Sequence, residues 1–460
     1  MDVGSWQMIA GLVVGISVLV GLILYSRIHA FPALIIAAIV TGLVGGMPFS
    51  KVIASVTKGF GGTLGSIGII IGFGIMMGAI FEKSGAAKRM ARVFLNLFGK
   101  GREEIALATT GFIVSIPIFC DSGFVILSPL AKAISRATGK SLITLGVALA
   151  AGLVITHHLI PPTPGPVASA EYFNVPLGDM ILFGLLLAIP LTIASIIYAR
   201  YIGNKVFRLP AQDSDDGFVD KPYAIGAGGQ WMEEDDSKLP SAWKSFAPIL
   251  IPVVLILLGT FTTALVPKAE RVGLMFSLID GLGSPVVAVG IGLVFAAFFL
   301  TDGMSRKDVV NTMDDSVKQA GIILLVTGGG GALGMVLRDS GAGTHVANLI
   351  ATMHLPAVIL PLAIATIVRL MQGSGTVAMV TSASIVAPMA ATLGLNPTLG
   401  ALACCTGAFI FSYFNDSYYW VVTRMLGVSD VREQIRIWSV TTTICWAVGC
   451  TILIIAGFFI

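Results

Sequence analysis

The stretch Ile116-Pro-Ile-Phe-Cys-Asp-Ser-Gly-Phe-Val-Ile-Leu-Ser-Pro129 lies inside an apolar run, 105–131, in which Asp121 is the only charged residue. At about 1.5 Å per residue, this run is too long for one straight crossing of a bilayer, but it suits two half-length helices that meet at a tip. Basic residues flank both ends of the run, which favours the cytoplasmic face for both. We therefore predict a re-entrant hairpin with its tip at Cys120–Gly123. A carboxylate at that depth is expected to be functional.

The composition places the chain among membrane proteins. Of its 460 residues, 55% are hydrophobic and 12% are charged, whereas about a quarter of the residues in soluble domains are charged. We predict an all-α polytopic membrane protein. The net charge of +3 gives no indication of a nucleic-acid partner. The five cysteines fall in apolar segments, without the spacing of a metal site, which predicts buried thiols.

A proline-rich break follows the hairpin. The apolar segment from Leu142 runs into His157-His-Leu-Ile-Pro-Pro-Thr-Pro-Gly-Pro166, and prolines so close together cannot continue a helix. We predict a broken transmembrane helix over 142–173 that resumes near Val167. An acidic, poorly apolar segment over 209–245 then predicts a cytoplasmic linker.

The second half of the chain repeats the first. Phe81-Glu-Lys-Ser-Gly-Ala86 matches Leu337-Arg-Asp-Ser-Gly-Ala342, and Asp121-Ser-Gly123 matches Gly373-Ser-Gly375 at nearly the same spacing. This predicts two membrane repeats, 1–208 and 246–460. The second has its own hairpin over 355–395 and its own broken helix over 398–424.

Each repeat is predicted to have five crossings and one hairpin, so the second inserts upside down. The basic loop over 83–102 and the segment 200–208 then lie inside, and both termini lie outside. Four basic residues fall on the outer face against the usual rule: Lys51, Lys58, Lys268 and Arg271. Inverted repeats with paired broken helices are typical of alternating-access transporters that bind substrate near the midplane.

The sequence resembles the gluconate permease family of bacterial proton symporters over essentially its whole length. The motifs that carry the resemblance are Ser84-Gly-Ala-Ala87, Phe119-Cys-Asp-Ser-Gly-Phe-Val125, the break at 157–166, Arg369-x-x-Gln-Gly-Ser-Gly-Thr-Val377 and Phe414-Asn-Asp-Ser417. The resemblance implies an importer of gluconate or a related small carboxylate in the bacterial inner membrane, with a two-hairpin inverted-repeat fold. Thr163 departs from the family's usual Pro-Pro-His-Pro, and Tyr418-Tyr419 also departs from the common pattern.

Three charged residues are candidates for the central chemistry. Arg369 lies in an otherwise uncharged run before the second tip, where it could hold the substrate carboxylate through paired donors or balance a carboxylate of the protein. Asp121 and Asp416 are the candidate proton-coupling sites. Their alternative roles are capping the helix after the tip and satisfying unwound backbone.

Further candidates line the two tips and the two breaks. His157 and His158 could contact substrate or relay a proton, and because they are adjacent on a helix we expect at most one to face the site. The helix N-termini after the tips suit a carboxylate. The remaining predicted substrate contacts are Ser122, Gly123, Ser374, Gly375, Thr376, Thr163, Asn415 and Ser417.

These features predict a secondary active transporter that imports gluconate or a related small hydroxylated carboxylate with a proton, by alternating access. The alternatives are another cargo (D-serine, D-glycerate, 3-hydroxybutyrate or a sugar-derived ketoacid), sodium coupling, and an anion channel. We predict no enzymatic activity, cofactor or metal. The expected partners are the substrate, the coupling ion and the lipid bilayer, with a homo-oligomer left open.

Overall fold

Helices make up most of the described chain, as expected for a backbone that must satisfy its own hydrogen bonds inside a bilayer. The computed structural model describes residues 3–26, 28–211, 217–220, 239–266, 271–341, 356–413 and 416–459. Within these ranges four helical segments are long and apolar enough to cross a membrane, or up to six if each of two bent pairs counts as one span.

The first half of the chain runs from α1 to the short β-hairpin. Its elements are α1 (Val3–Leu24), α2 (Ala30–Val44), α3 (Phe49–Ser84), α4 (Ala86–Phe98), α5 (Glu103–Val114), α6 (Cys120–Thr138), α7 (Leu142–Leu159), α8 (Pro164–Tyr172), α9 (Leu177–Lys205), β1 (Leu209–Pro210) and β2 (Phe218–Val219). The two strands pair antiparallel and lie within the predicted linker 209–245. The rest of that linker, up to residue 238, lies almost entirely outside the described residues.

The second half of the chain runs from α10 to α20. Its elements are α10 (Ala242–Leu265), α11 (Leu274–Gly283), α12 (Pro285–Phe299), α13 (Arg306–Ser340), α15 (Ile359–Gln372), α16 (Gly375–Val386), η3 (Ala387–Met389), α17 (Pro397–Gly407), α18 (Ser417–Met425), α19 (Val431–Gln434), η4 (Ile435–Ser439) and α20 (Val440–Ala456).

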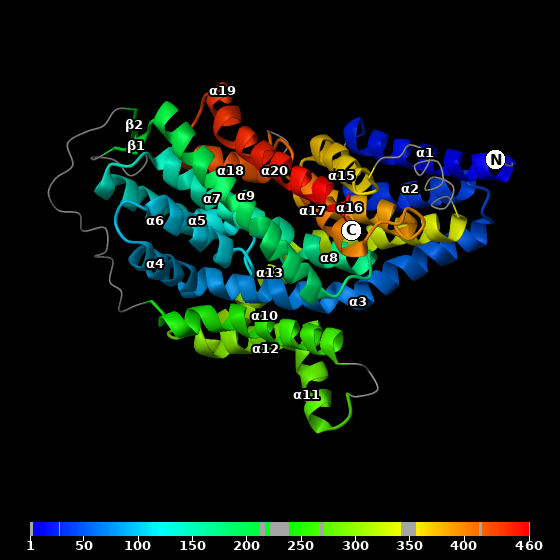
Figure 1. Ribbon diagram of the computed structural model, residues 1–460, viewed down its shortest axis with the longest axis horizontal. Helices are drawn as coiled ribbons and strands as arrows, with labels where there is room; N and C mark the ends of the chain where they lie inside the picture. The colour runs from blue at the N-terminus through cyan, green and yellow to red at the C-terminus, as the bar shows by residue number, and fades with distance from the viewer. Residues whose placement is uncertain are drawn as a thin grey trace.

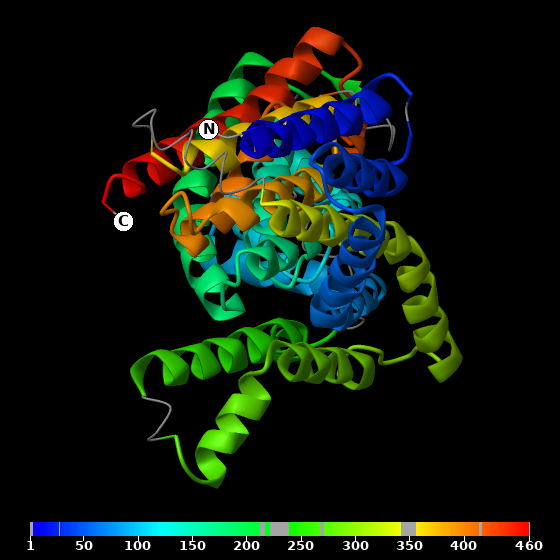
Figure 2. The same ribbon diagram turned by 90° about the vertical axis from the view of Figure 1, so that its right-hand side faces the viewer.

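Helix α7 forms the centre of the molecule, and every one of its residues is buried. It packs against α5, α6 and α9. The long helices α3 and α13 pack along one another and run in opposite directions. The end of α3 lies beside the start of α13, where Lys83 donates to Thr312 (2.9 Å). Helices α10 and α12 lie side by side along one side of the molecule, and α11 projects away from them, with a bend of 70° between α11 and α12 (Figures 1 and 2).

Both long helices end in the same way. Gly85 after α3 and Gly341 after α13 have φ values of 76° and 74°, in the left-handed region that favours glycine and stops a helix. These are the two glycines of the repeated Ser-Gly-Ala motif. The motif is therefore a helix stop in both halves.

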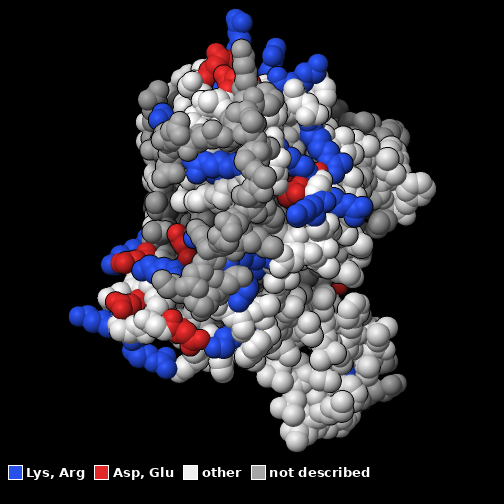
Figure 3. All heavy atoms as spheres, turned by 90° about the vertical axis from the view of Figure 1, so that its left-hand side faces the viewer, with Lys and Arg blue, Asp and Glu red and all other residues white. Residues whose placement is uncertain are grey.

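Basic side chains gather at one end of the molecule, the left end of Figure 1. Figure 3 looks onto this end, where Lys and Arg are interspersed with acidic residues. Lys140 there contacts Glu103 (2.7 Å) and Glu104 (2.6 Å), and Arg200 contacts Glu104 (2.6 Å). This charged cluster joins the starts of α5 and α7 to α9.

Three predicted boundaries need correction. The basic segment 83–102 is not a loop, since most of it forms α4, an amphipathic helix that buries Met90 and Leu95. The chain turns over 115–119, around Pro117, so Cys120–Gly123 is the first turn of α6 and not the tip itself. After the proline-rich break the helix resumes at Pro164, earlier than Val167, because proline is well tolerated at the first helical position.

Candidate functional site

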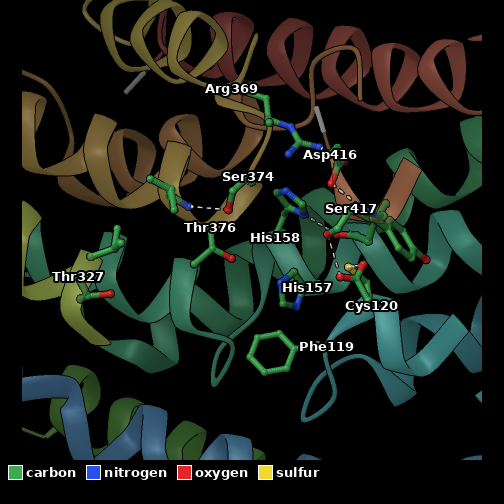
Figure 4. A pocket seen from close by; sticks show the side chains of 17 residues that line it. Phe119, Cys120, His157, His158, Thr327, Arg369, Ser374, Thr376, Asp416 and Ser417 are labelled. Atoms are coloured by element: carbon green, nitrogen blue, oxygen red, sulfur yellow. Dashed lines mark hydrogen bonds and ion pairs between the residues drawn. The ribbon is translucent and has the colours of Figure 1, made fainter. Parts of the chain in front are cut away.

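A cavity of about 350 Å³ lies where the breaks after α7 and α17 meet the turns between α5 and α6 and between α15 and α16 (Figure 4). Most of the residues predicted for the site line it: Asp121, His157, His158, Arg369, Ser374, Gly375, Thr376, Asp416 and Ser417. They come from α6, α7, α15, α16 and α18 and from the turns before α16 and α18. Residues almost 300 positions apart in the sequence therefore share one wall.

Arg369 and Asp416 form a buried ion pair in the cavity. Arg369 lies in the last turn of α15, and its side chain points across the cavity to the Asp416 carboxylate (Figure 4). Both residues are less than a tenth exposed, at 4% and 7%. An arginine is expensive to bury at this depth without an anion, so the pairing explains how the cavity wall holds the guanidinium.

Asp416 is held by further hydrogen bonds. It caps α18 by accepting from the Tyr418 amide (3.1 Å), and it accepts from the Ser412 hydroxyl (2.5 Å). Ser412 in turn accepts from the Trp438 indole nitrogen (3.0 Å). The carboxylate is therefore fixed relative to the helices after it, while Arg369 contacts it from α15.

Asp121 is bonded differently. It lies in the first turn of α6, where it accepts from the Ser417 hydroxyl (3.2 Å) and lies 3.8 Å from the Cys120 sulfur. Among the described residues it makes no ion pair. The contact with Ser417 joins the first turn of α6 to the first turn of α18, and thus one half of the chain to the other.

His157 and His158 both line the cavity, so the prediction that at most one faces it is wrong. The reason is that the cavity lies around the end of α7, where the helix unwinds and neither ring is covered by a following turn. His158 Nδ1 lies 2.9 Å from the Val154 carbonyl, so Nδ1 must donate and Nε2 is left as an acceptor. His158 Nε2 and His157 Nδ1 have no hydrogen-bond partner within the described chain.

Two helix N-termini open onto the cavity. α6 begins at Cys120 and α16 at Gly375, and the Ser374 hydroxyl accepts from the Val377 amide (3.4 Å) to cap α16. A Cβ on Gly375 would lie 2.1 Å from His158 Nε2, so only glycine fits between this helix and the imidazole. Helix N-termini present amides and a positive dipole end, which attract an anion.

Some predicted residues are not brought to this cavity. Gly123 packs against Leu153 on α7, and Thr163 donates to the Ile160 carbonyl (2.6 Å) within the break. Neither lines the cavity. The side chain of Ser122 and the whole of Asn415 lie outside the described residues.

Several residues that line the cavity were not predicted from the sequence. Thr327 on α13 lines the cavity, and its buried hydroxyl has no partner among the residues described. Phe119 and Cys120 also line it, and so does Tyr418, one of the two tyrosines that depart from the family's common pattern. Cys120 and Phe119 could have been found because they precede Asp121 directly, but Thr327 carries no signal in a helix otherwise notable for glycine.

The cavity can hold a small anion beside two carboxylates. Arg369 and the two N-termini supply positive potential, and the histidine nitrogens and Thr327 supply neutral hydrogen-bonding groups. No cluster of three or more metal-ligating side chains occurs in the part of the chain that the structure describes. The positive and neutral groups of the lining are complementary to a small organic anion that carries hydroxyl groups.

Comparison with known proteins places the chain in a family. A family model described as "GntP family permease" matches residues 7–459. The high-affinity gluconate transporter of Escherichia coli is 35% identical over 448 residues, which cover 96% of this chain and 98% of that protein. The L-idonate transporter of Escherichia coli is 32% identical, with 95% of each chain covered. An uncharacterized permease of Haemophilus influenzae is 44% identical, covering 98% of this chain and 92% of its own.

Two solved transporters share the fold. The YdaH transporter of Alcanivorax borkumensis superposes with a TM-score of 0.61 at 15% identity, covering 89% of this chain and 88% of that one. MtrF of Neisseria gonorrhoeae, described as illuminating a class of antimetabolite efflux pumps, gives a TM-score of 0.64 at 15% identity, with 95% and 96% covered. At this identity the likeness concerns the fold alone.

Proposed function

The chain belongs to the GntP family of permeases, and on that premise we propose that it imports gluconate or a closely related hydroxylated carboxylate together with a proton. The family resemblance inferred from the motifs is confirmed. The chain is a multi-pass membrane transporter rather than an enzyme, since its relatives are permeases and transporters. The bacterial inner membrane is the proposed location.

One observation carries the proposal: a buried arginine, two helix N-termini and two histidine nitrogens that have no partner among the described residues converge on one cavity beside two carboxylates. The positive groups suit the carboxylate of a sugar acid, and the neutral donors and acceptors suit its hydroxyl groups. A cavity of about 350 Å³ is within the range typical of small-molecule sites.

Arg369 is the proposed clamp for the substrate carboxylate. Asp416 is paired with the guanidinium, so an incoming carboxylate competes with Asp416 for the same donors. Protonation of Asp416 would remove that competition. Binding of the proton and binding of the anion then favour each other, which is the requirement for symport.

Asp121 is the second proposed proton site. Its partners are a hydroxyl and a thiol, neither of which carries the positive charge that would hold the carboxylate ionised. Because Ser417 and Asp121 belong to opposite halves of the chain, a proton on Asp121 would change the contact between those halves.

The proposed fold behind this mechanism is an inverted repeat of 1–208 and 246–460, separated by a cytoplasmic linker. The repeated order of a long helix, paired helices and a broken helix supports it, with α3, α5–α6 and α7–α8 corresponding to α13, α15–α16 and α17–α18. On this interpretation α5–α6 and α15–α16 are re-entrant hairpins. Alternating access would move one set of elements around the shared cavity.

Uptake into proteoliposomes tests the function. We expect labelled gluconate to accumulate when an inward proton gradient is imposed, and to exchange with unlabelled gluconate without a gradient. A sodium gradient in place of the proton gradient should drive nothing. Accumulation with sodium alone would overturn proton coupling, and uptake that runs down its gradient without counterflow would instead identify a channel.

Competition identifies the cargo. Unlabelled L-idonate and other six-carbon sugar acids should compete with gluconate, whereas D-serine and 3-hydroxybutyrate should compete weakly because they offer fewer hydroxyl groups to the histidines and Thr327. Stronger competition by D-serine than by any sugar acid would contradict the substrate class.

A further inference from the structure

A second cavity, of about 230 Å³, lies between α3, α8, α13 and α16. Lys58, Glu171 and Arg338 carry the charges that line it, so its formal charge is positive. The side chains of Lys58 and Arg338 are exposed. The proposed transport mechanism does not use this second cavity, although two basic side chains line it. We call the first cavity, which contains Arg369 and Asp121, the transport cavity.

The two cavities follow one another along the axes of α13 and α16. Thr327 lines the transport cavity, and Gly331, Gly334 and Arg338 line the second cavity. The spacing of these four residues puts them on one face of α13, and Thr327 and Gly331 are separated by about 6 Å along the helix axis. On α16, Thr376 and Ser384 repeat this arrangement.

One side chain links the linings of the two cavities. Tyr172, the last residue of α8, lines the second cavity and donates its hydroxyl hydrogen to the Thr327 carbonyl (2.6 Å). A Cβ on Gly330 would lie 2.7 Å from the Tyr172 oxygen and 2.9 Å from Val380. The bare backbone at Gly330 therefore makes room for the hydroxyl to reach its acceptor.

The second cavity lies toward the end of the molecule away from the charged cluster. Val336 and Gly341, in the last two turns of α13 and just after it, lie against Gly42 and Met8. The start of α13, by contrast, lies beside Lys83 at the basic end. In the proposed topology the second cavity faces outward, and Lys58 is one of the basic residues that break the positive-inside tendency.

We infer that this second cavity is the outer vestibule of the transport pathway, a waiting site for small organic anions, and that Tyr172 is the gate between it and the transport cavity. The inference rests on the proposed function. The positive charges of Lys58 and Arg338 raise the local concentration of the anion. The negative charge of Glu171 weakens its binding, so that the anion can leave the vestibule. Breaking the bond from Tyr172 to Thr327 opens the way inward.

Labelling of Cys120 tests the gate without any transport measurement. This native thiol is buried and lines the transport cavity, so its rate of modification by a membrane-impermeant methanethiosulfonate applied to right-side-out vesicles measures access from the outer face. The Tyr172→Phe variant loses one hydrogen bond and should label about fivefold faster than the unchanged protein. The labelled peptide is identified by mass spectrometry, and Cys120→Ser is the control for the site of labelling.

Kinetics test the vestibule. Lys58→Gln and Arg338→Gln should each raise KM about threefold or more, mainly without a fall in kcat, and the effect should shrink at high salt. Glu171→Gln should lower KM. Lys51→Gln is the matched control, because Lys51 is an exposed lysine two turns earlier on α3 that does not line the cavity.

The possible outcomes distinguish a failure of the gate or the vestibule from a failure of the proposed function. Unchanged labelling of Cys120 in Tyr172→Phe, or faster labelling only when the reagent is added to the bath of inverted vesicles, which exposes the cytoplasmic face, would overturn the gate. A KM shift of the same sign for Glu171→Gln and Lys58→Gln would overturn the vestibule. Failure of the proposed function would appear instead as absent gluconate uptake by the unchanged protein, while the labelling result stands by itself.

Discussion

At the scale of single residues, the site is built around one guanidinium, that of Arg369. Asp416 holds Arg369, and Ser412 with the Tyr418 amide holds Asp416 in turn. The sequence left two interpretations of Arg369 open, a clamp for substrate or a partner for a carboxylate. In the proposed cycle these are two successive states of the same side chain.

Replacing Arg369 with lysine tests the clamp. Lysine keeps the charge but loses the planar fork that matches two carboxylate oxygens. Losing a charge-assisted hydrogen bond predicts a KM for gluconate roughly tenfold to a hundredfold higher, measured as initial uptake rates in proteoliposomes.

Arg424→Lys is the matched control for that experiment. Arg424 lies over the Trp420 ring, 5.2 Å from its centre, and does not line the transport cavity. An unchanged KM in Arg369→Lys, or an equal rise in both variants, would show that the fork does not contact substrate.

Replacing Asp121 with asparagine tests proton coupling. Asparagine keeps the size and can still bond to Ser417, but it cannot take up a proton. We expect exchange of labelled for unlabelled gluconate to continue while accumulation under a proton gradient is lost. Asp179→Asn, at a carboxylate in the first turn of α9, should accumulate normally. Full accumulation by Asp121→Asn would exclude it as a coupling site.

At the scale of elements, close approach of backbones fixes how the paired helices sit. Gly78 on α3 faces the turn between α5 and α6, and a Cβ there would lie 2.4 Å from the Pro117 carbonyl oxygen. The turn that carries the chain into α6, and therefore places Asp121, rests directly on this glycine.

An alanine at position 78 should move that turn or strain it. Overpacking of this kind costs roughly 1–3 kcal/mol, so we expect Gly78→Ala to lower the midpoint of thermal unfolding in detergent by a few degrees. Gly72→Ala on the same helix is the control, because a Cβ at that position would have no neighbouring atom within 4 Å. Equal midpoints for the two variants would contradict the packing role.

The elements also show what a sequence can and cannot predict. The break after α7 and the turn before α16 were predictable because Pro161, Pro162 and Gly373 restrict the local backbone. The convergence of Arg369 with Asp121 followed from matching the two halves. Thr327 and Tyr172 were not predictable, since their roles depend on neighbours far away in the chain. The helical nature of α4 was missed because its charges suggested a loop.

At the scale of the whole molecule, the charged end is held together by a partly buried cluster. Burial raises the pKa of Glu103 and of Glu104, but hydrogen bonds from Lys140 and from backbone amides outweigh it and hold both pKa values below 4.5. Burial lowers the pKa of Lys140, but the two carboxylates outweigh it and raise this pKa above 10.5. All three groups are therefore charged throughout the neutral range.

This cluster predicts an acid limit of stability. Because both carboxyl pKa values are lower in the folded state, their stabilisation is complete above pH 4.5 and is lost as the pH falls through the folded values. The midpoint of thermal unfolding should fall on acidification below that point. The double variant Glu103→Gln, Glu104→Gln should be less stable at pH 7 and should show a flatter decline.

Asp315→Asn provides the comparison, since the pair of Asp315 and Lys318 is solvent-exposed and contributes little. Its acid profile should match that of the unchanged protein. An identical acid slope in the double variant would show that other groups set the acid limit.

The bounded volume of the transport cavity has a metabolic consequence. Helices from both halves wall the transport cavity and bound its volume at about 350 Å³. If the cargo is a sugar acid as proposed, the free acid fits such a volume more easily than the same acid linked to another sugar. We therefore expect such a conjugate to be taken up only after it has been cleaved outside the cell.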